Sequence, residues 1–276
     1  MAHTLKRLLK WPYEACCALL FDPRDVLRKL CGLPFFAANL VRYARRNRQT
    51  AFRLRLTQLQ YASGDRFLPG GATRGHYFHQ DLWAARVVYE RGIRELTDIG
   101  SRLDGFVAHV LPFCSVRYVD IRPLPAQVEG LEYIRGSVTA LPFANDSIAA
   151  LSCLHVIEHV GLGRYGDPVS PDGHTEAAKE LVRVLKPGGL LLLGTPVGKQ
   201  RLCFDAHRVF DPQTAVEAFQ GLRLEEFALI DDAGQGIARN ASFEAARQCS
   251  FGCGLFVFTK PCPEARADSG GAKCRP

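Results

Sequence analysis

Apolar runs alternate with helix-compatible segments through most of the sequence after residue 90. Five of the runs occupy residues 96–99, 116–119, 133–134, 148–154 and 190–193, and a last pair of strands is predicted at 222–230 and 254–259. Such alternation predicts an α/β fold in which helices cover both faces of a mostly parallel, seven-stranded sheet.

Glycine and proline divide the chain into three parts. The motif Lys186-Pro187-Gly188-Gly189 ends a helix predicted over 176–185 and leads into the next strand. Residues 63–75 have the composition of a loop. We therefore predict a helical extension over 1–62, the α/β domain over 63–260 and a disordered tail over 261–276.

Positive charge is concentrated at the beginning of the chain. Residues 1–60 contain twelve Lys or Arg and three Asp or Glu, whereas the whole chain has a net charge of +7. We expect two or three short amphipathic helices here, interrupted by Pro12, Pro23 and Pro34. Such a region can contact anionic lipid, nucleic acid or an acidic partner, or be a solvated helical face. Peripheral membrane contact is the partner prediction, and nucleic acid is the less favoured alternative.

The ten cysteines show no CxxC pair, which favours reduced thiols in a cytoplasmic protein. Cys249, Cys253 and Cys262 fit no familiar zinc module, and Cys253 opens an apolar strand, so a structural role is predicted for them. Neither apolar stretch near the start reaches the roughly 18 to 20 residues that a membrane-spanning helix needs. The predicted location is cytoplasmic, with membrane-peripheral contact through the basic region as an option.

Polar and glycine residues follow the predicted strands, at the edge of the sheet where α/β proteins bind ligands. Gly100 permits a tight turn after the first strand, and Asp120 ends the second strand twenty residues later. A carboxylate in that place can accept both hydrogen bonds from a ribose diol. The candidate cofactor-binding residues are Asp98, Gly100, Ser101, Asp120, Ser137, Val138 and Leu154.

These features together resemble the class I S-adenosylmethionine-dependent methyltransferases over about 165 residues. The resemblance rests on the DxG turn at Asp98, on Asp120, and on the phrases GSVTALPF, EHV and LKPGG. It implies a Rossmann-like methyltransferase fold and S-adenosylmethionine as cofactor. The phrases GHYFHQDLW, HVIEHVGLGRYGDP and CFDAHRVF further resemble an uncharacterised methyltransferase-related family of unknown function. Arg102, Asp104 and Ser137 depart from the pattern of the larger family, which has glycines at the first two places and an acidic residue at the third.

The chemistry is predicted at His155, Glu158 and His159, which fall on one side of a helical turn after the fourth strand. The phrase resembles the ExxEH arrangement of metal-dependent small-RNA and quinone-precursor O-methyltransferases, and this resemblance implies His207 as a fourth ligand. Histidine in place of the first glutamate favours Zn²⁺ or Mn²⁺ over Mg²⁺. In a metal-free alternative, His159 or His155 is a general base that Glu158 orients. A third alternative gives these residues packing and capping roles.

The functional prediction is a methyltransferase that acts on an oxygen acceptor of a small molecule or glycan. Arg164 is a candidate to clamp an acidic group of that acceptor, within the glycine-rich loop GLGRYGDP. Two alternatives stay open. One is a non-catalytic binding protein on a degenerate methyltransferase fold, and the other is a nucleotide-sugar-using enzyme of glycan biosynthesis.

Overall fold

The computed structural model describes residues 22–46, 54–68, 71, 73–125 and 127–263. They belong to two compact units, Met1–Ala72 and Thr73–Pro276. Parts of the predicted basic extension, including Pro12, and most of the predicted tail lie outside the described residues.

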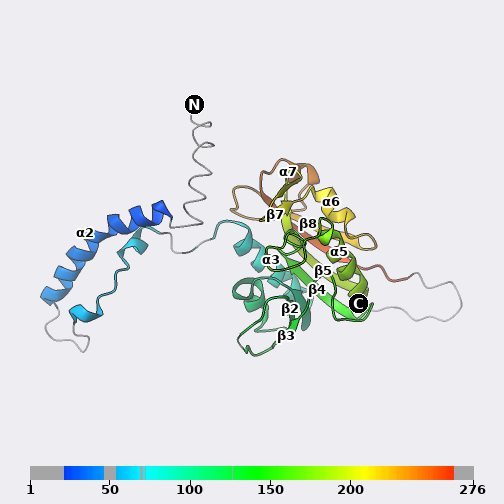
Figure 1. Cartoon of the computed structure of the whole chain (residues 1–276), viewed down its shortest axis with the longest axis horizontal. Helices are drawn as coiled ribbons and strands as arrows, with labels where there is room; N and C mark the ends of the chain where they lie inside the picture. The colour runs from blue at the N-terminus through cyan, green and yellow to red at the C-terminus, as the bar shows by residue number, and fades with distance from the viewer. Residues whose placement is uncertain (1–21, 47–53, 69–70, 72, 126, 264–276) are drawn as a thin grey trace. The chain divides into compact units, whose positions relative to one another are not determined.

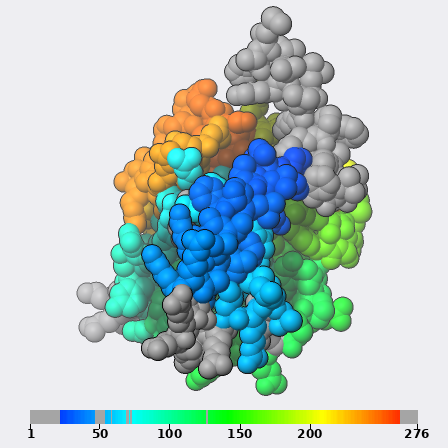
Figure 2. Space-filling view, turned by 90° about the vertical axis from the view of Figure 1, so that its left-hand side faces the viewer, coloured from blue at the N-terminus to red at the C-terminus, as the bar shows by residue number. Residues whose placement is uncertain are grey.

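The described residues of the first unit form one long helix, α2 (Pro23–Arg46), and two 3₁₀ turns, η1 (Leu56–Gln58) and η2 (Ser63–Phe67). The helix continues through Pro34, so the predicted break at that residue is wrong. Proline removes one backbone donor from the helical ladder, but α2 stays continuous and packs against η2. In Figure 2 the blue helix lies beside the lighter blue residues that follow it in the chain. Gly32 is buried there, where a Cβ would collide with the Tyr61 hydroxyl. No helix among the described residues is long and apolar enough to cross a membrane.

An eight-stranded sheet forms the centre of the second unit, in the order β3-β2-β1-β4-β5-β10-β8-β9. Its strands are β1 (Glu95–Ile99), β2 (Ser115–Asp120), β3 (Leu131–Arg135), β4 (Ile148–Leu154), β5 (Leu185–Val197), β8 (Arg223–Ile230), β9 (Ala238–Arg239) and β10 (Gly252–Thr259). Strands β1 to β5 are parallel, and β10 lies antiparallel between β5 and β8.

The strand order confirms the predicted Rossmann-like α/β class, with eight strands instead of seven. The additional strand is β9, whose two residues pair with β8 at the edge of the sheet. A separate hairpin joins β6 (Arg201–Cys203) to β7 (His207–Val209). Strands of two or three residues are too short to produce a visible alternation of apolar and polar positions.

Helices cover both faces of the sheet (Figure 1). One face packs on α3 (His76–Glu90), the π-turn η3 (Leu103–Val107) and α4 (Ala108–Val110), and the other on α5 (Gly173–Val184), α6 (Pro212–Glu217) and α7 (Phe243–Arg247). Strand β10 divides its buried side chains between the two layers. Leu255 and Val257 join Trp83 of α3, whereas Phe256 and Phe258 join the core beneath α5. The twofold period of a strand produces this division.

Two aspartates each precede a helix on the face that α5, α6 and α7 cover, and only one of them caps its helix. Asp211 accepts a hydrogen bond from the Gln213 amide at 2.9 Å and pairs with Arg247 at 2.8 Å. Asp172 makes no side-chain cap bond to α5. We expect Asp211→Ala to lower the free energy of unfolding by about 1 kcal/mol, and Asp172→Ala to lower it much less. Urea denaturation of both variants measures this difference, and equal losses would contradict the assignment of the cap.

Candidate functional site

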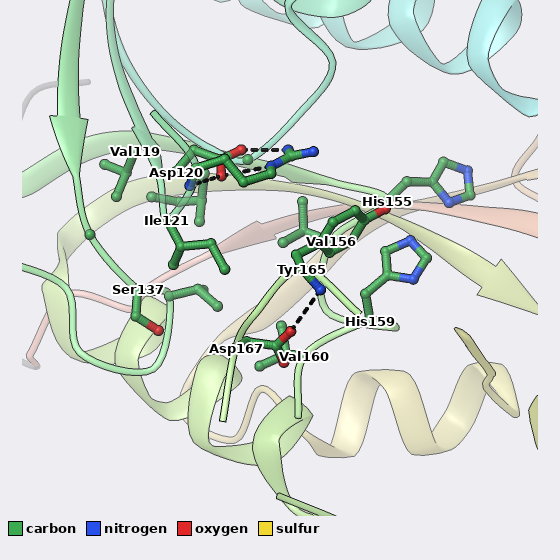
Figure 3. A pocket seen from close by; sticks show the side chains of 15 residues that line it. Val119, Asp120, Ile121, Ser137, His155, Val156, His159, Val160, Tyr165 and Asp167 are labelled. Carbon is green, nitrogen blue, oxygen red and sulfur yellow. Dashed lines mark hydrogen bonds and ion pairs between the residues drawn. The ribbon is translucent and has the colours of Figure 1, made fainter. Parts of the chain in front are cut away.

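The candidate site lies where β1 separates β2 from β4, at the carboxyl ends of the parallel strands. The chain connections that leave the strands on the two sides of such a point lead away in opposite directions and leave a crevice for a ligand. A pocket there is lined by residues that follow β1, β2, β3 and β4. Figure 3 shows Asp120 and Ser137 on one side of this pocket and the imidazoles of His155 and His159 on the other.

The turn after β1 is stabilised by a buried carboxylate. Asp98 accepts hydrogen bonds from the Ser101 amide at 2.9 Å, the Ser101 hydroxyl at 2.6 Å and the Ser152 hydroxyl at 2.6 Å. Gly100 has φ 65°, and its amide donates to the Val119 carbonyl at 2.9 Å. Asp98 is fully buried, so it shapes the turn from beneath, whereas Gly100 lines the pocket.

The ionisation of Asp98 gives a pH-dependent prediction. Burial raises its pKa to about 6, although the bonds from Ser101 and Ser152 oppose that rise. A carboxyl with a higher pKa in the folded state than in the unfolded state reduces stability as pH rises from about 4 to about 6. We expect Asp98→Asn to remove this component, so the stability of wild type relative to the variant should fall across that window. Denaturation at several pH values measures it, and a constant difference would contradict the prediction.

The carboxylate that ends β2 is already paired. Asp120 accepts from the Arg122 guanidinium at 2.6 and 3.0 Å and from the Tyr118 hydroxyl at 3.0 Å. Burial would raise the pKa of Asp120, but the bonds from Arg122 and Tyr118 lower it below its ordinary value. Arg122 in turn lies over the ring of Tyr165, 4.7 Å from its centroid. Tyr118 and Arg122 are not among the residues predicted from the sequence, although an arginine two residues after a strand-end aspartate is a visible signal.

The remaining predicted cofactor residues lie on two adjoining cavities. Ser137 and Val138 follow β3 and line the same pocket as Asp120. Ser101 and Leu154 line the neighbouring cavity, where the Leu154 amide donates to the Ser101 hydroxyl at 3.2 Å. The two departures from the family's glycines, Arg102 and Asp104, pair with each other at 2.7 Å on the rim of that cavity.

Glu158 is the centre of the predicted catalytic group. Its side chain is 1% exposed and accepts a hydrogen bond from Nδ1 of His155 at 2.7 Å. Burial would raise the pKa of Glu158, but the charge and the hydrogen bond of His155 lower it. Nε2 of His159 lies 3.7 Å from the same carboxylate oxygen. The structure thus brings all three side chains together, as the spacing predicts.

His207 lines a third cavity together with His155, Glu158 and His159. It lies in β7, its ring centroid is 4.9 Å from that of Phe251, and burial lowers its pKa. In the part of the chain that the structure describes, these four residues do not form a group whose ligand atoms all lie within 4.8 Å of one another. Their role as a metal site stays a prediction.

Two further residues at this site come from distant parts of the chain. The ring of His76, at the start of α3, stacks on that of His155 with centroids 5.3 Å apart. Burial, with the neighbouring His155, lowers the pKa of His76 to about 4. Cys253, read from sequence as structural, is fully buried near both histidines. Neither residue belongs to a local motif, since 177 positions separate them in the sequence.

The glycine-rich loop after His159 forms a wall shared by the cavities. Asp167 accepts from the Gly161 amide at 2.7 Å, and Arg164 donates to the Ala206 carbonyl at 3.0 Å. Tyr165 lines all three cavities. The first bond closes the loop on itself, and the second connects the loop to the hairpin of β6 and β7.

The strand order is that of the Rossmann-like fold, and the sequence is similar to proteins named as methyltransferases. An uncharacterised methyltransferase of Mycobacterium sp. (strain JLS) is 33% identical over 124 residues, which cover 42% of this chain and 44% of that protein. Another, of Mycolicibacterium vanbaalenii, is 29% identical over 158 residues, covering 54% and 55%. The chain thus spans about half the length of the curated relatives it matches, and the predicted resemblance to methyltransferases is confirmed.

Residues 142–227 match a family described as "Caenorhabditis protein of unknown function, DUF268". Among solved structures, the N-methyltransferase NodS of Bradyrhizobium japonicum WM9, in complex with S-adenosylhomocysteine, is similar at 15% identity and a TM-score of 0.46, covering 66% of this chain and 86% of that one. A protein of Galdieria sulphuraria named as a sarcosine dimethylglycine methyltransferase is similar at 16% identity and a TM-score of 0.49, covering 66% of this chain and 85% of that one.

Proposed function

We propose that the chain is an S-adenosylmethionine-dependent methyltransferase that acts on a hydroxyl oxygen of a small molecule or glycan. One observation carries the proposal: the pocket at Asp120 and the cavity at His207 share His155, His159 and Tyr165 as lining residues. A nucleoside bound at the strand ends and an acceptor bound among the histidines would therefore meet at these side chains. The relatives named as methyltransferases support the same reaction class.

The residues of the pocket fit the proposed cofactor. Gly100 has no side chain to fill the crevice, and a Cβ there would lie 3.3 Å from Val156 and 4.0 Å from Asp120. Val119 and Val138 offer apolar surface to an adenine ring, and Asp120 offers carboxylate oxygens to a ribose diol. Arg122 has to release Asp120 for that contact. Its side chain is 51% exposed, so the guanidinium can turn into solvent without leaving a buried charge.

His159 is the proposed general base. Its Nδ1 lies 2.6 Å from the Ala206 carbonyl oxygen, which can only accept a hydrogen bond, so Nδ1 carries the proton. The lone pair of Nε2 is then free to accept a proton from an acceptor hydroxyl. When bound, S-adenosylmethionine supplies an electrophilic methyl group, which leaves sulfur as the acceptor oxygen bonds to it and yields S-adenosylhomocysteine. Arg164, next to His159, can pair with an anionic group on the acceptor.

The experiment is a search for methyl transfer with methyl-labelled S-adenosylmethionine and pools of hydroxylated small molecules and oligosaccharides. We expect label in an alkali-stable methyl ether and an equal amount of S-adenosylhomocysteine. Label in an amine product would contradict only the choice of oxygen as the acceptor atom, and would leave the methyltransferase activity supported. Turnover of a nucleotide sugar, with no transfer of label, would favour the sugar-processing alternative.

A further inference from the structure

Three possible metal ligands meet beside the proposed acceptor cavity. They are His76 at the start of α3, His155 directly after β4, and Cys253 in β10. Their ligand atoms all lie within 4.8 Å of one another, and no other set of three among the described residues meets this criterion. Three separate elements thus bring two imidazoles and one thiol to a single place.

His155 is already oriented as a metal ligand would be. Its Nδ1 donates a hydrogen bond to the Glu158 carboxylate. Its Nε2 is buried without a hydrogen-bond partner, and the side chain is only 6% exposed. A buried nitrogen without a partner is costly, whereas a carboxylate behind a histidine is the usual second shell of a metal site. The backbone of His155 has φ 56°, a conformation that costs a non-glycine residue energy and that clusters at functional sites.

The other two residues complement this nitrogen. Nε2 of His76 lies 3.0 Å from the Phe251 carbonyl oxygen, so it carries the proton, and Nδ1 keeps a lone pair. Cys253 is fully buried, and its thiol faces the Gln80 side-chain oxygen at 3.7 Å. Loss of the thiol proton would leave a buried anion, which a neighbouring cation, either a protonated His155 or a bound metal ion, would have to neutralise.

We propose that His76, His155 and Cys253 bind a zinc ion, with the fourth coordination position directed to the cavity that His76 and His155 line. Thiolate with imidazole favours zinc over magnesium or calcium. Three protein ligands and one open position are typical of catalytic zinc sites. Bond lengths of about 2.0 to 2.3 Å place the ligand atoms of a tetrahedral site about 3.3 to 3.7 Å apart, so closure needs movements of roughly an ångström. Binding releases one proton, that of the Cys253 thiol.

The role of the ion rests on the proposed function, whereas its binding does not. An ion at this place would lower the pKa of an acceptor hydroxyl and help its proton to pass to His159. Glu158 would then be a positioning residue that fixes the tautomer of His155. This ligand set differs from the one implied by the sequence resemblance, because it replaces Glu158, His159 and His207 with His76 and Cys253.

The test is titration of the full chain with Co²⁺, after removal of bound metal under reducing conditions. We expect one Co²⁺ per chain, visible d–d bands of a tetrahedral ion, and a thiolate-to-cobalt charge-transfer band in the near ultraviolet that zinc abolishes. Cys253→Ser should remove the charge-transfer band. Cys249→Ser is the matched control, because this second buried cysteine lies outside the cluster and should leave the band unchanged.

Further variants keep the proposal falsifiable if Cys253→Ser does not fold. His76→Gln, at a half-buried helix start, should weaken cobalt binding and change the d–d bands, and Glu158→Gln should weaken binding by about 10- to 100-fold. His159→Gln and His207→Gln should keep the band. Folded wild type that binds no cobalt, or binds it without a thiolate band, would overturn the proposal. Failure of S-adenosylhomocysteine to bind a chain with a normal cobalt spectrum would overturn the proposed function alone.

Discussion

Replacing His159 by glutamine should lower the rate of methyl transfer by about 10²- to 10⁴-fold, the usual contribution of a positioned general base. The hydrogen bond from Nδ1 to the Ala206 carbonyl fixes the tautomer, so only Nε2 can take up the acceptor's proton. Glutamine has a similar reach and can donate to the same carbonyl, but it accepts no proton at neutral pH. We expect the affinity for S-adenosylhomocysteine to change little.

Turnover with the acceptor found for wild type, with kcat and KM measured separately, checks this prediction. Arg164→Lys is a useful comparison, since it keeps a cation beside His159 and should change KM more than kcat. An unchanged kcat in His159→Gln would show that another group accepts the proton.

The second prediction concerns Asp120 and Arg122, for which we expect opposite effects on cofactor affinity. Asp120→Ala should weaken binding of S-adenosylhomocysteine by about 100-fold or more, because two charge-assisted hydrogen bonds to a ribose diol are lost. Arg122→Ala should tighten binding by about two- to fivefold, because a half-exposed ion pair worth about 0.5 to 1 kcal/mol no longer competes for the carboxylate.

Opposite signs separate a direct contact from a general loss of structure. Asp120 also accepts a bond from Tyr118, so Tyr118→Phe is the control for the loss of the tyrosine hydroxyl, which also donates to the Ser101 carbonyl at 3.1 Å. We expect this variant to bind S-adenosylhomocysteine within a few-fold of wild type. If Asp120→Ala and Arg122→Ala weaken binding equally, the carboxylate acts through its ion pair and not on the ligand.

Much of the sheet could be predicted because its signals are local. The apolar runs at β1, β2, β3 and β4, with LKPGG before the body of β5, identify the parallel strands within a few residues. The two-residue β9 and the hairpin of β6 and β7 have no such pattern. The helix runs through Pro34 because packing against a neighbouring turn overrides the local preference of a single residue.

Spacing along the chain predicts which residues follow a strand, but not where each side chain points. Asp98 is the residue before the end of β1 and Asp120 ends β2, yet the first is enclosed by two serines and the second lines the pocket. The twofold alternation of β1 and the turn at Gly100 decide this outcome. His76 and Cys253 could not be predicted at the site, because only the crossing of α3 over β10 brings them together.

The most direct test of the account is a calorimetric titration of the wild-type chain with S-adenosylhomocysteine, with uridine diphosphate glucose as the comparison ligand. We expect one site with a micromolar dissociation constant for S-adenosylhomocysteine, competition by S-adenosylmethionine and no heat with the nucleotide sugar. Absence of binding by folded wild type and by Arg122→Ala would contradict it and favour a non-catalytic protein on this fold.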